Sequence, residues 1–167
     1  YELWVYPKKA LEKKGVIIAK DLNDEVVKVL EKGGKVLWMP TASSHFVAAD
    51  DTLSQADNAT PYTVDGLFQT DYWNYRMFKT ICENNKKKVS PGTLGILTNP
   101  EHPIFKGFPT EMHTNWQWFP VIKESHPLVL DNFAKDYRPI VQVIDNIERN
   151  HKLGLVMEWK VGAGKLL

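Results

Sequence analysis

Residues 16–39 read VIIAKDLNDEVVKVLEKGGKVLWM, and this stretch decides the predicted fold. Its two ends, residues 16–19 and 35–39, are short apolar runs typical of buried strands. Between them, Asn23 or Asp24 can cap a helix whose first turn is acidic, and a double glycine then stops that helix. A strand, a helix and a strand in this order predict a β-α-β unit with parallel strands and a right-handed crossover.

The two runs are apolar throughout instead of alternating, which is typical of a parallel sheet covered by helices on both faces. Further strands are predicted at residues 92–97, 139–144 and 154–161, and residues 162–164 turn the chain into a last extended segment. The strands after residue 139 can be antiparallel. We therefore expect an α/β fold with a mostly parallel sheet and terminal antiparallel strands.

Composition places the chain among ordinary globular domains. Its 167 residues are 43% hydrophobic and 25% charged, so residues 1–167 are expected to form a single domain. Strand-like residues at both ends predict that this domain is cut from a longer polypeptide. The net charge of +1 argues against a nucleic-acid partner, and the lack of a run of roughly 20 apolar residues argues against a membrane. A single cysteine, Cys82, rules out an internal disulfide.

Residues 108–119, FPTEMHTNWQWF, form the candidate functional segment. Aromatic rings can stack on a sugar, and carboxylate, imidazole and amide groups can bind its hydroxyls. The candidate carbohydrate-binding residues are Glu111, His113, Asn115, Trp116, Gln117 and Trp118. A buried structural corner would use the same residue types, and general burial habits favour it.

We expect no catalytic residue in this chain. Cys82 lacks the glycine-flanked elbow of an amidotransferase nucleophile, and no Gly-x-Ser-x-Gly motif occurs. Glycoside hydrolysis needs two carboxylates about 5 to 10 Å apart, and the barrel that usually carries it needs about 250 residues. The carboxylates considered for this role are Asp65, Glu111, Asp145 and Glu158.

Neither a metal nor a cofactor is expected. The three histidines of the middle region, with two nearby glutamates, show no zinc-binding spacing, and a histidine before a proline commonly caps a loop. These residues are Glu101, His102, Glu111, His113 and His126. The glycine pairs do not form a phosphate-binding loop, and no flavin-specific motif is present.

Several motifs together resemble an accessory domain of large bacterial β-galactosidase-like proteins of the glycoside hydrolase family 2 group. They are the double glycine, Gly92-Thr-Leu-Gly95, Pro100-Glu-His-Pro103, residues 108–118, Ile144-Asp-Asn-Ile-Glu-Arg-Asn150 and Val161-Gly-Ala-Gly-Lys165. The resemblance implies a three-layer sandwich that is flavodoxin-like or class I glutamine amidotransferase-like. It also implies a periplasmic or secreted parent hydrolase that carries the catalytic barrel.

Two functional hypotheses follow. In the first, the chain is a non-catalytic accessory domain that packs against other domains of the same polypeptide or supports its assembly. In the second, it is a carbohydrate-binding module in which Trp116 or Trp118 stacks on a sugar.

Overall fold

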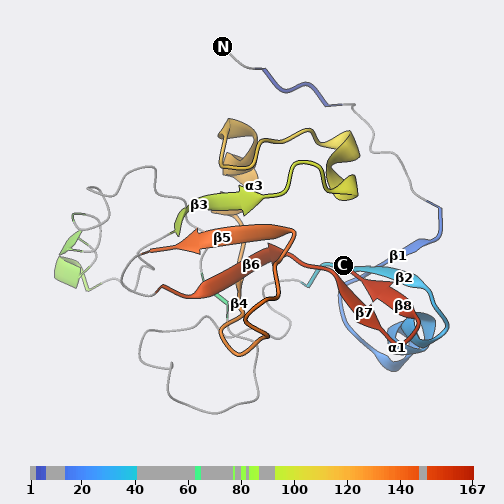
Figure 1. Cartoon of the computed structure of the whole chain (residues 1–167). Helices are drawn as coiled ribbons and strands as arrows, with labels where there is room; N and C mark the ends of the chain where they lie inside the picture. Colours follow the sequence, from blue (N-terminus) through green and yellow to red (C-terminus); the bar gives the residue numbers. More distant parts are fainter. Residues whose placement is uncertain are drawn as a thin grey trace. The chain divides into compact units, whose positions relative to one another are not determined.

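The computed structural model describes residues 3–6, 14–40, 63–64, 77, 80–81, 83–86, 93–146 and 150–167. These residues belong to two compact units, both drawn in Figure 1. The terminal unit combines Tyr1–His45 with Glu158–Leu167, and the central unit comprises Phe46–Met157. Each unit is built around its own four-stranded sheet.

The terminal unit contains a mixed sheet and one helix. Its elements are β1 (Val16–Ala19), α1 (Asp24–Glu31), β2 (Lys35–Trp38), β7 (Trp159–Val161) and β8 (Gly164–Leu166). The strand order is β1-β2-β8-β7, in which β1, β2 and β8 are parallel and β7 is antiparallel to β8. The predicted parallel β-α-β pairing of β1 with β2 and the predicted turn before β8 are therefore confirmed.

The predicted capping signals fix the two ends of α1. The side chain of Asn23 accepts a hydrogen bond from Val26 N at 3.0 Å, which satisfies one of the free amides of the first turn. The helix ends before Gly33, whose φ of 88° favours glycine. Between these ends, α1 buries Leu30 against Val36 and Leu166.

The central unit contains an antiparallel sheet. Its strands are β3 (Thr93–Thr98), β4 (Leu128–Val129), β5 (Val141–Asp145) and β6 (Lys152–Val156), in the order β3-β5-β6-β4. Three short helical elements lie between β3 and β4: η1 (Pro103–Gly107), η2 (Trp116–Trp118) and α3 (Phe119–Lys123). In β5, Val141 and Val143 are buried whereas Gln142 and Ile144 are more exposed, the alternation typical of a sheet with one face in the core.

The core of the central unit lies between the inner face of this sheet and the helical elements. Ile96, Val143 and Leu153, which come from three neighbouring strands, pack in one cluster. Phe105 of η1, Trp118 of η2 and Ile122 of α3 belong to the same cluster, and all six residues are buried. The candidate segment is thus anchored directly in this core.

The prediction of a three-layer, mostly parallel sandwich of the flavodoxin-like or class I glutamine amidotransferase-like type is wrong. One sheet is mixed, the other is entirely antiparallel, and the two α-helices whose bounds the structure describes, α1 and α3, are short. The apolar run of β1 misled the prediction, because Val16, Ile17 and Ile18 are 37%, 45% and 70% exposed. They are not covered on both faces.

The prediction of a single strand at residues 154–161 is also wrong, because this stretch forms parts of two strands. Residues up to Val156 belong to β6 of the central sheet, whereas residues from Trp159 onward belong to β7 of the terminal sheet. The helix predicted at residues 70–82 lies largely outside the described residues. Its described positions, 77, 80 and 81, are helical as predicted, but Met77 and Ile81 of the expected apolar stripe are exposed. In the described part of the chain, every helix is too short to cross a bilayer.

Candidate functional site

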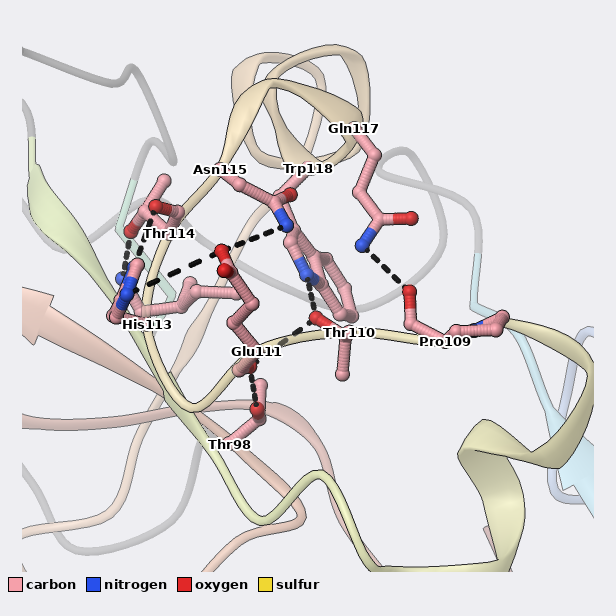
Figure 2. Close-up of polar contacts among 10 residues, drawn as sticks. Thr98, Pro109, Thr110, Glu111, His113, Thr114, Asn115, Gln117 and Trp118 are labelled. Carbon is pink, nitrogen blue, oxygen red and sulfur yellow. Dashed lines mark hydrogen bonds and ion pairs between the residues drawn. The ribbon is translucent and has the colours of Figure 1, made fainter. Parts of the chain in front are cut away.

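The middle of the candidate segment, residues 111–114, lies against the outer edge of β3, one of the two edge strands of the central sheet (Figure 2). Thr98 N donates a hydrogen bond to Met112 O at 3.0 Å, and Thr98 Oγ1 donates to Glu111 O at 2.6 Å. Ile96 N donates to Thr114 Oγ1 at 2.8 Å, and His113 forms an antiparallel bridge with Leu97. The segment therefore occupies hydrogen-bonding groups that would otherwise be free on this edge.

The end of the segment is buried and holds itself in place. Trp118 is 4% exposed, and its Nε1 donates to Thr110 Oγ1 at 2.6 Å. Its ring packs edge-on against Phe108, with 5.0 Å between ring centroids. Gln117 is 8% exposed, and its Nε2 donates to Pro109 O at 2.9 Å, as Figure 2 shows. These two side chains link η2 back to residues 109 and 110, which is a structural role.

The middle of the segment carries two large apolar side chains on its surface. Trp116 is 69% exposed, and its ring is tilted against Phe119 with 5.7 Å between centroids. Met112 is 63% exposed. We call Met112 and Trp116, together with the neighbouring side chains of Glu111 and His113, the exposed half of the segment.

The polar side chains of this half make weak contacts with one another. Glu111 Oε2 accepts from Asn115 Nδ2 at 3.4 Å and lies 4.0 Å from His113 Nε2. His113 Nδ1 lies 3.0 Å from Thr114 O, and because a carbonyl can only accept, this bond requires the proton on Nδ1. When the His113 ring is neutral, its Nε2 is therefore a hydrogen-bond acceptor, like the Glu111 carboxylate near it. Since the side chains of His113 and Glu111 are 64% and 51% exposed, both can accept hydrogen bonds from a ligand.

The structure divides the six candidate binding residues into two sets. It brings Glu111, His113 and Asn115 together, and Figure 2 shows their side chains converging. Glu111 and His113 are exposed, whereas Asn115 is half-buried. The two tryptophans go to different environments, since Trp116 is exposed and Trp118 is in the core. Gln117 is buried with Trp118, so these two side chains do not lie on the same surface as Trp116.

Two of the other carboxylates considered from the sequence, Asp145 and Glu158, have structural partners. Asp145 is buried and accepts from the backbone amides of Asn146 at 2.8 Å and His151 at 2.9 Å. In the terminal unit, Glu158 Oε1 lies 3.0 Å from Lys165 Nζ. Asp65 and Cys82 lie outside the described residues.

Within the described residues, no three side chains of His, Cys, Asp or Glu lie together as a metal site would require. His102 instead caps η1: its Nδ1 accepts from Ile104 N at 3.3 Å. This contact confirms the expectation that a histidine before a proline caps a loop.

One polar cluster was not predicted from the sequence. Asp131 Oδ2 lies 2.6 Å from His151 Nδ1, and Asp131 Oδ1 accepts from Lys152 N at 2.8 Å. Lys152 Nζ in turn donates to Ala134 O at 3.0 Å. The partners are some twenty residues apart and share no local motif, so only the pairing of β4 with β6 brings them together.

A comparison with protein families gives a match over almost the whole chain. A family model described as "Domain of unknown function (DUF8487)" matches residues 17–167. No curated protein matches the chain. The family match includes every strand of both sheets apart from the first residue of β1, and it includes the whole of residues 108–119. The chain therefore belongs to the DUF8487 family.

Proposed function

We propose that this chain is a non-catalytic accessory domain of a β-galactosidase-like glycoside hydrolase that acts in carbohydrate degradation. Its exposed half of residues 108–119 contacts another domain of the same polypeptide. The observation that carries the proposal is the division of this segment between a core-anchored end, with Trp118, and a surface that presents Trp116 and Met112.

The exposed half has the composition of an interface. Trp and Met are enriched in the buried centres of protein interfaces, whereas charged groups such as those of Glu111 and His113 are tolerated at the polar rim. Burying Trp116 and Met112 against a partner would remove apolar surface from water.

The backbone beneath this surface is already fixed. The bonds from Trp118 to Thr110 and from Gln117 to Pro109 hold the two ends of the segment, and β3 holds its middle. A pre-ordered segment loses less conformational entropy on binding than a flexible loop does. This supports docking in the present conformation.

The class of parent polypeptide rests on the sequence resemblance. Residues 108–118 and Val161-Gly-Ala-Gly-Lys165 resemble the accessory domains of β-galactosidase-like proteins. The structure supports the docking role independently of that resemblance, through the exposure of Trp116 and Met112.

Oxidative footprinting tests the docking role. Hydroxyl radicals should oxidise Met112 and Trp116 several-fold more slowly in the full-length polypeptide than in this chain alone, because a neighbouring domain covers them. Met39, which is 55% exposed in the terminal unit, serves as the reference residue. Equal oxidation of Met112 and Trp116 in both samples would reject the proposal.

A matched pair of variants provides a second readout. In the full-length polypeptide, Met112→Ala with Trp116→Ala should accelerate proteolytic release of this chain, whereas Met39→Ala should not. Unchanged release from the double variant would contradict docking through this surface.

A second candidate function is carbohydrate binding by the same surface. It is favoured by the exposed ring of Trp116 and by two exposed acceptors of the same segment, the Glu111 carboxylate and, in the neutral ring, His113 Nε2. A sugar could stack its apolar face on the ring while its hydroxyls donate to these groups.

Tryptophan fluorescence separates the two candidates. Titration with galactosides and with plant and host glycans should give a saturable change only if the surface binds sugar, and Trp116→Ala should abolish that change. Trp38→Phe, in the terminal unit, is the control and should preserve it. A flat response across the panel would eliminate this second function without affecting the footprinting result.

A further inference from the structure

The sheet of the terminal unit has one face that α1 does not cover. The helix packs on the face that carries Val36 and Leu166, which are register partners on β2 and β8. Because successive side chains of a strand point to opposite faces, Lys35 and Lys165 project from the other face. They are also register partners. We call this side of the sheet the open face.

Three lysines form a row across the open face. Lys35 on β2 is paired with Lys165 on β8, and Lys165 is paired with Lys160 on β7. Neighbouring strands are about 4.8 Å apart, so the three ammonium groups extend from adjacent positions. All three residues are exposed.

This row is only partly neutralised. Glu158 Oε1 contacts Lys165 Nζ at 3.0 Å, but neither Lys35 nor Lys160 forms an ion pair with a described residue. Like charges directly opposite one another on a sheet are destabilising. A row of lysines in register therefore opposes folding of the sheet, and a bound partner of opposite charge would relieve the repulsion.

Apolar side chains lie beside the lysines. Ile18 and Leu37 are register partners on the open face, two residues along the strands from Val16 and Lys35. Ile18 is 70% exposed, Val16 is 37% exposed and Leu37 is half-buried. The open face thus combines a basic row with an apolar row about 7 Å away along the strands.

The charge and composition of this face select one kind of occupant. A second copy placed on it would bring one lysine row against another. Single-stranded nucleic acid needs aromatic side chains for stacking, but Trp38 and Trp159 belong to the cluster under α1 on the other face. An anionic lipid surface is typically recognised by clusters of four to eight basic residues, and this row has three.

We propose that the open face binds an extended acidic polypeptide segment in which carboxylates and apolar side chains take turns at every second residue, so that both kinds project toward the sheet. The carboxylates pair with Lys35 and Lys160, and an apolar side chain of the segment covers Ile18 and Leu37. The site is independent of residues 108–119, because it lies wholly within the terminal unit.

Fluorescence anisotropy with a labelled peptide that repeats Glu-Ser-Leu-Ser, in which glutamate and leucine share one face of the extended chain, tests this inference. The chain should bind the peptide saturably and more weakly as salt is added, because salt screens exposed charges. The variant Lys35→Gln/Lys160→Gln should raise the dissociation constant by about two-fold to thirty-fold, the range expected when two exposed ion pairs are lost. The matched variant Lys28→Gln/Lys32→Gln, on α1 and after its end, should change it by less than about two-fold.

Three controls make the outcome decisive. A peptide with glutamine in place of glutamate should not bind the unaltered chain, a readout that does not depend on the folding of any variant. Single-stranded DNA and phosphatidylserine vesicles should bind more weakly than the acidic peptide. Absence of saturable peptide binding, equal effects of the two lysine variants, or equal binding of DNA or vesicles would each overturn the proposal.

Discussion

Trp116 and Trp118 stand two positions apart, yet one ring is at the surface and the other is in the core. The reason is the local geometry of η2. A 3-10 helix turns by about 120° per residue, so side chains two positions apart project in different directions. Gln117 completes the turn and is also buried.

This difference predicts unequal effects on stability. Trp118→Ala should lower the free energy of unfolding by about 3–5 kcal/mol, because it empties a core site and removes the hydrogen bond from Trp118 Nε1 to Thr110 Oγ1. Trp116→Ala should lower it by less than about 1 kcal/mol, since that ring is mostly hydrated. Urea unfolding followed by circular dichroism measures both values. Similar losses for the two variants would contradict the division of the segment.

Asp145 allows a second test at the level of single residues. Asp145→Ala should cost about 2–4 kcal/mol of stability, because the backbone amides of Asn146 and His151 lose their acceptor. Asp136→Ala, at an exposed carboxylate, should change stability by less than about 0.5 kcal/mol. The same urea unfolding experiment applies. A negligible loss for Asp145→Ala would show that its carboxylate is not structural.

Helix α1 and strand β8 approach each other closely at Gly164. A Cβ atom added at Gly164 would lie 2.4 Å from Leu30 O and 2.6 Å from Gly34 O, and both of these are backbone atoms. Gly164 is therefore required for helix α1 to lie on strand β8.

Gly164→Ala should destabilise the terminal unit by about 1–3 kcal/mol, because helix and strand must separate to admit the methyl group. Hydrogen exchange of the amides of β2 and α1 should accelerate accordingly. Gly107→Ala is the matched control, since a Cβ there would meet nothing within 4 Å. Unchanged exchange in Gly164→Ala would refute the close approach.

Local elements were predictable from the sequence where the signal was itself local. The cap at Asn23 and the glycine stop at Gly33 located α1 and hence the β1-α1-β2 unit. The pairing of β2 with β8 was not predictable, because the partner lies more than a hundred residues away and no local pattern specifies it. The exposure of Ile18 was misread for the same reason: an apolar run does not reveal which neighbours cover it.

For the candidate segment, the sequence indicated its position in the chain but not which of its side chains are buried. Its density of aromatic and hydrogen-bonding side chains singled out residues 108–119 as a candidate functional segment, but it did not indicate that part of the segment pairs with β3. The separation of Trp116 from Trp118 depends on η2, a single turn whose side-chain directions no composition argument provides. The Asp131 and His151 contact arises only from tertiary folding.

For the whole molecule, the main feature is that the terminal unit is assembled from both ends of the sequence. Residues 158–167 supply β7 and β8, two of the four strands of its sheet. Leu166 in β8 also fills the cluster beneath α1.

A chain ending at Met157 should therefore lose the terminal unit and keep the central one. Hydrogen exchange should show the amides of β1 and β2 exchanging at nearly unfolded rates, because β2 has lost its partner β8 and the cluster is open. The amides of β5 and β6 provide the internal control and should stay protected. Persistent protection of β1 and β2 would show that residues 158–167 are dispensable for the sheet.

The same arrangement sets an order of events during synthesis. The ribosome releases β1, α1 and β2 early, but β8 emerges roughly 125 residues after β2, a delay of about 6–25 s at a translation rate of about 5–20 residues per second. All the strands of the central unit leave the ribosome within that interval. The central unit can therefore fold first, while the apolar side chains of β1 and β2 are still without β8, and this nascent stage is the one most in need of a chaperone.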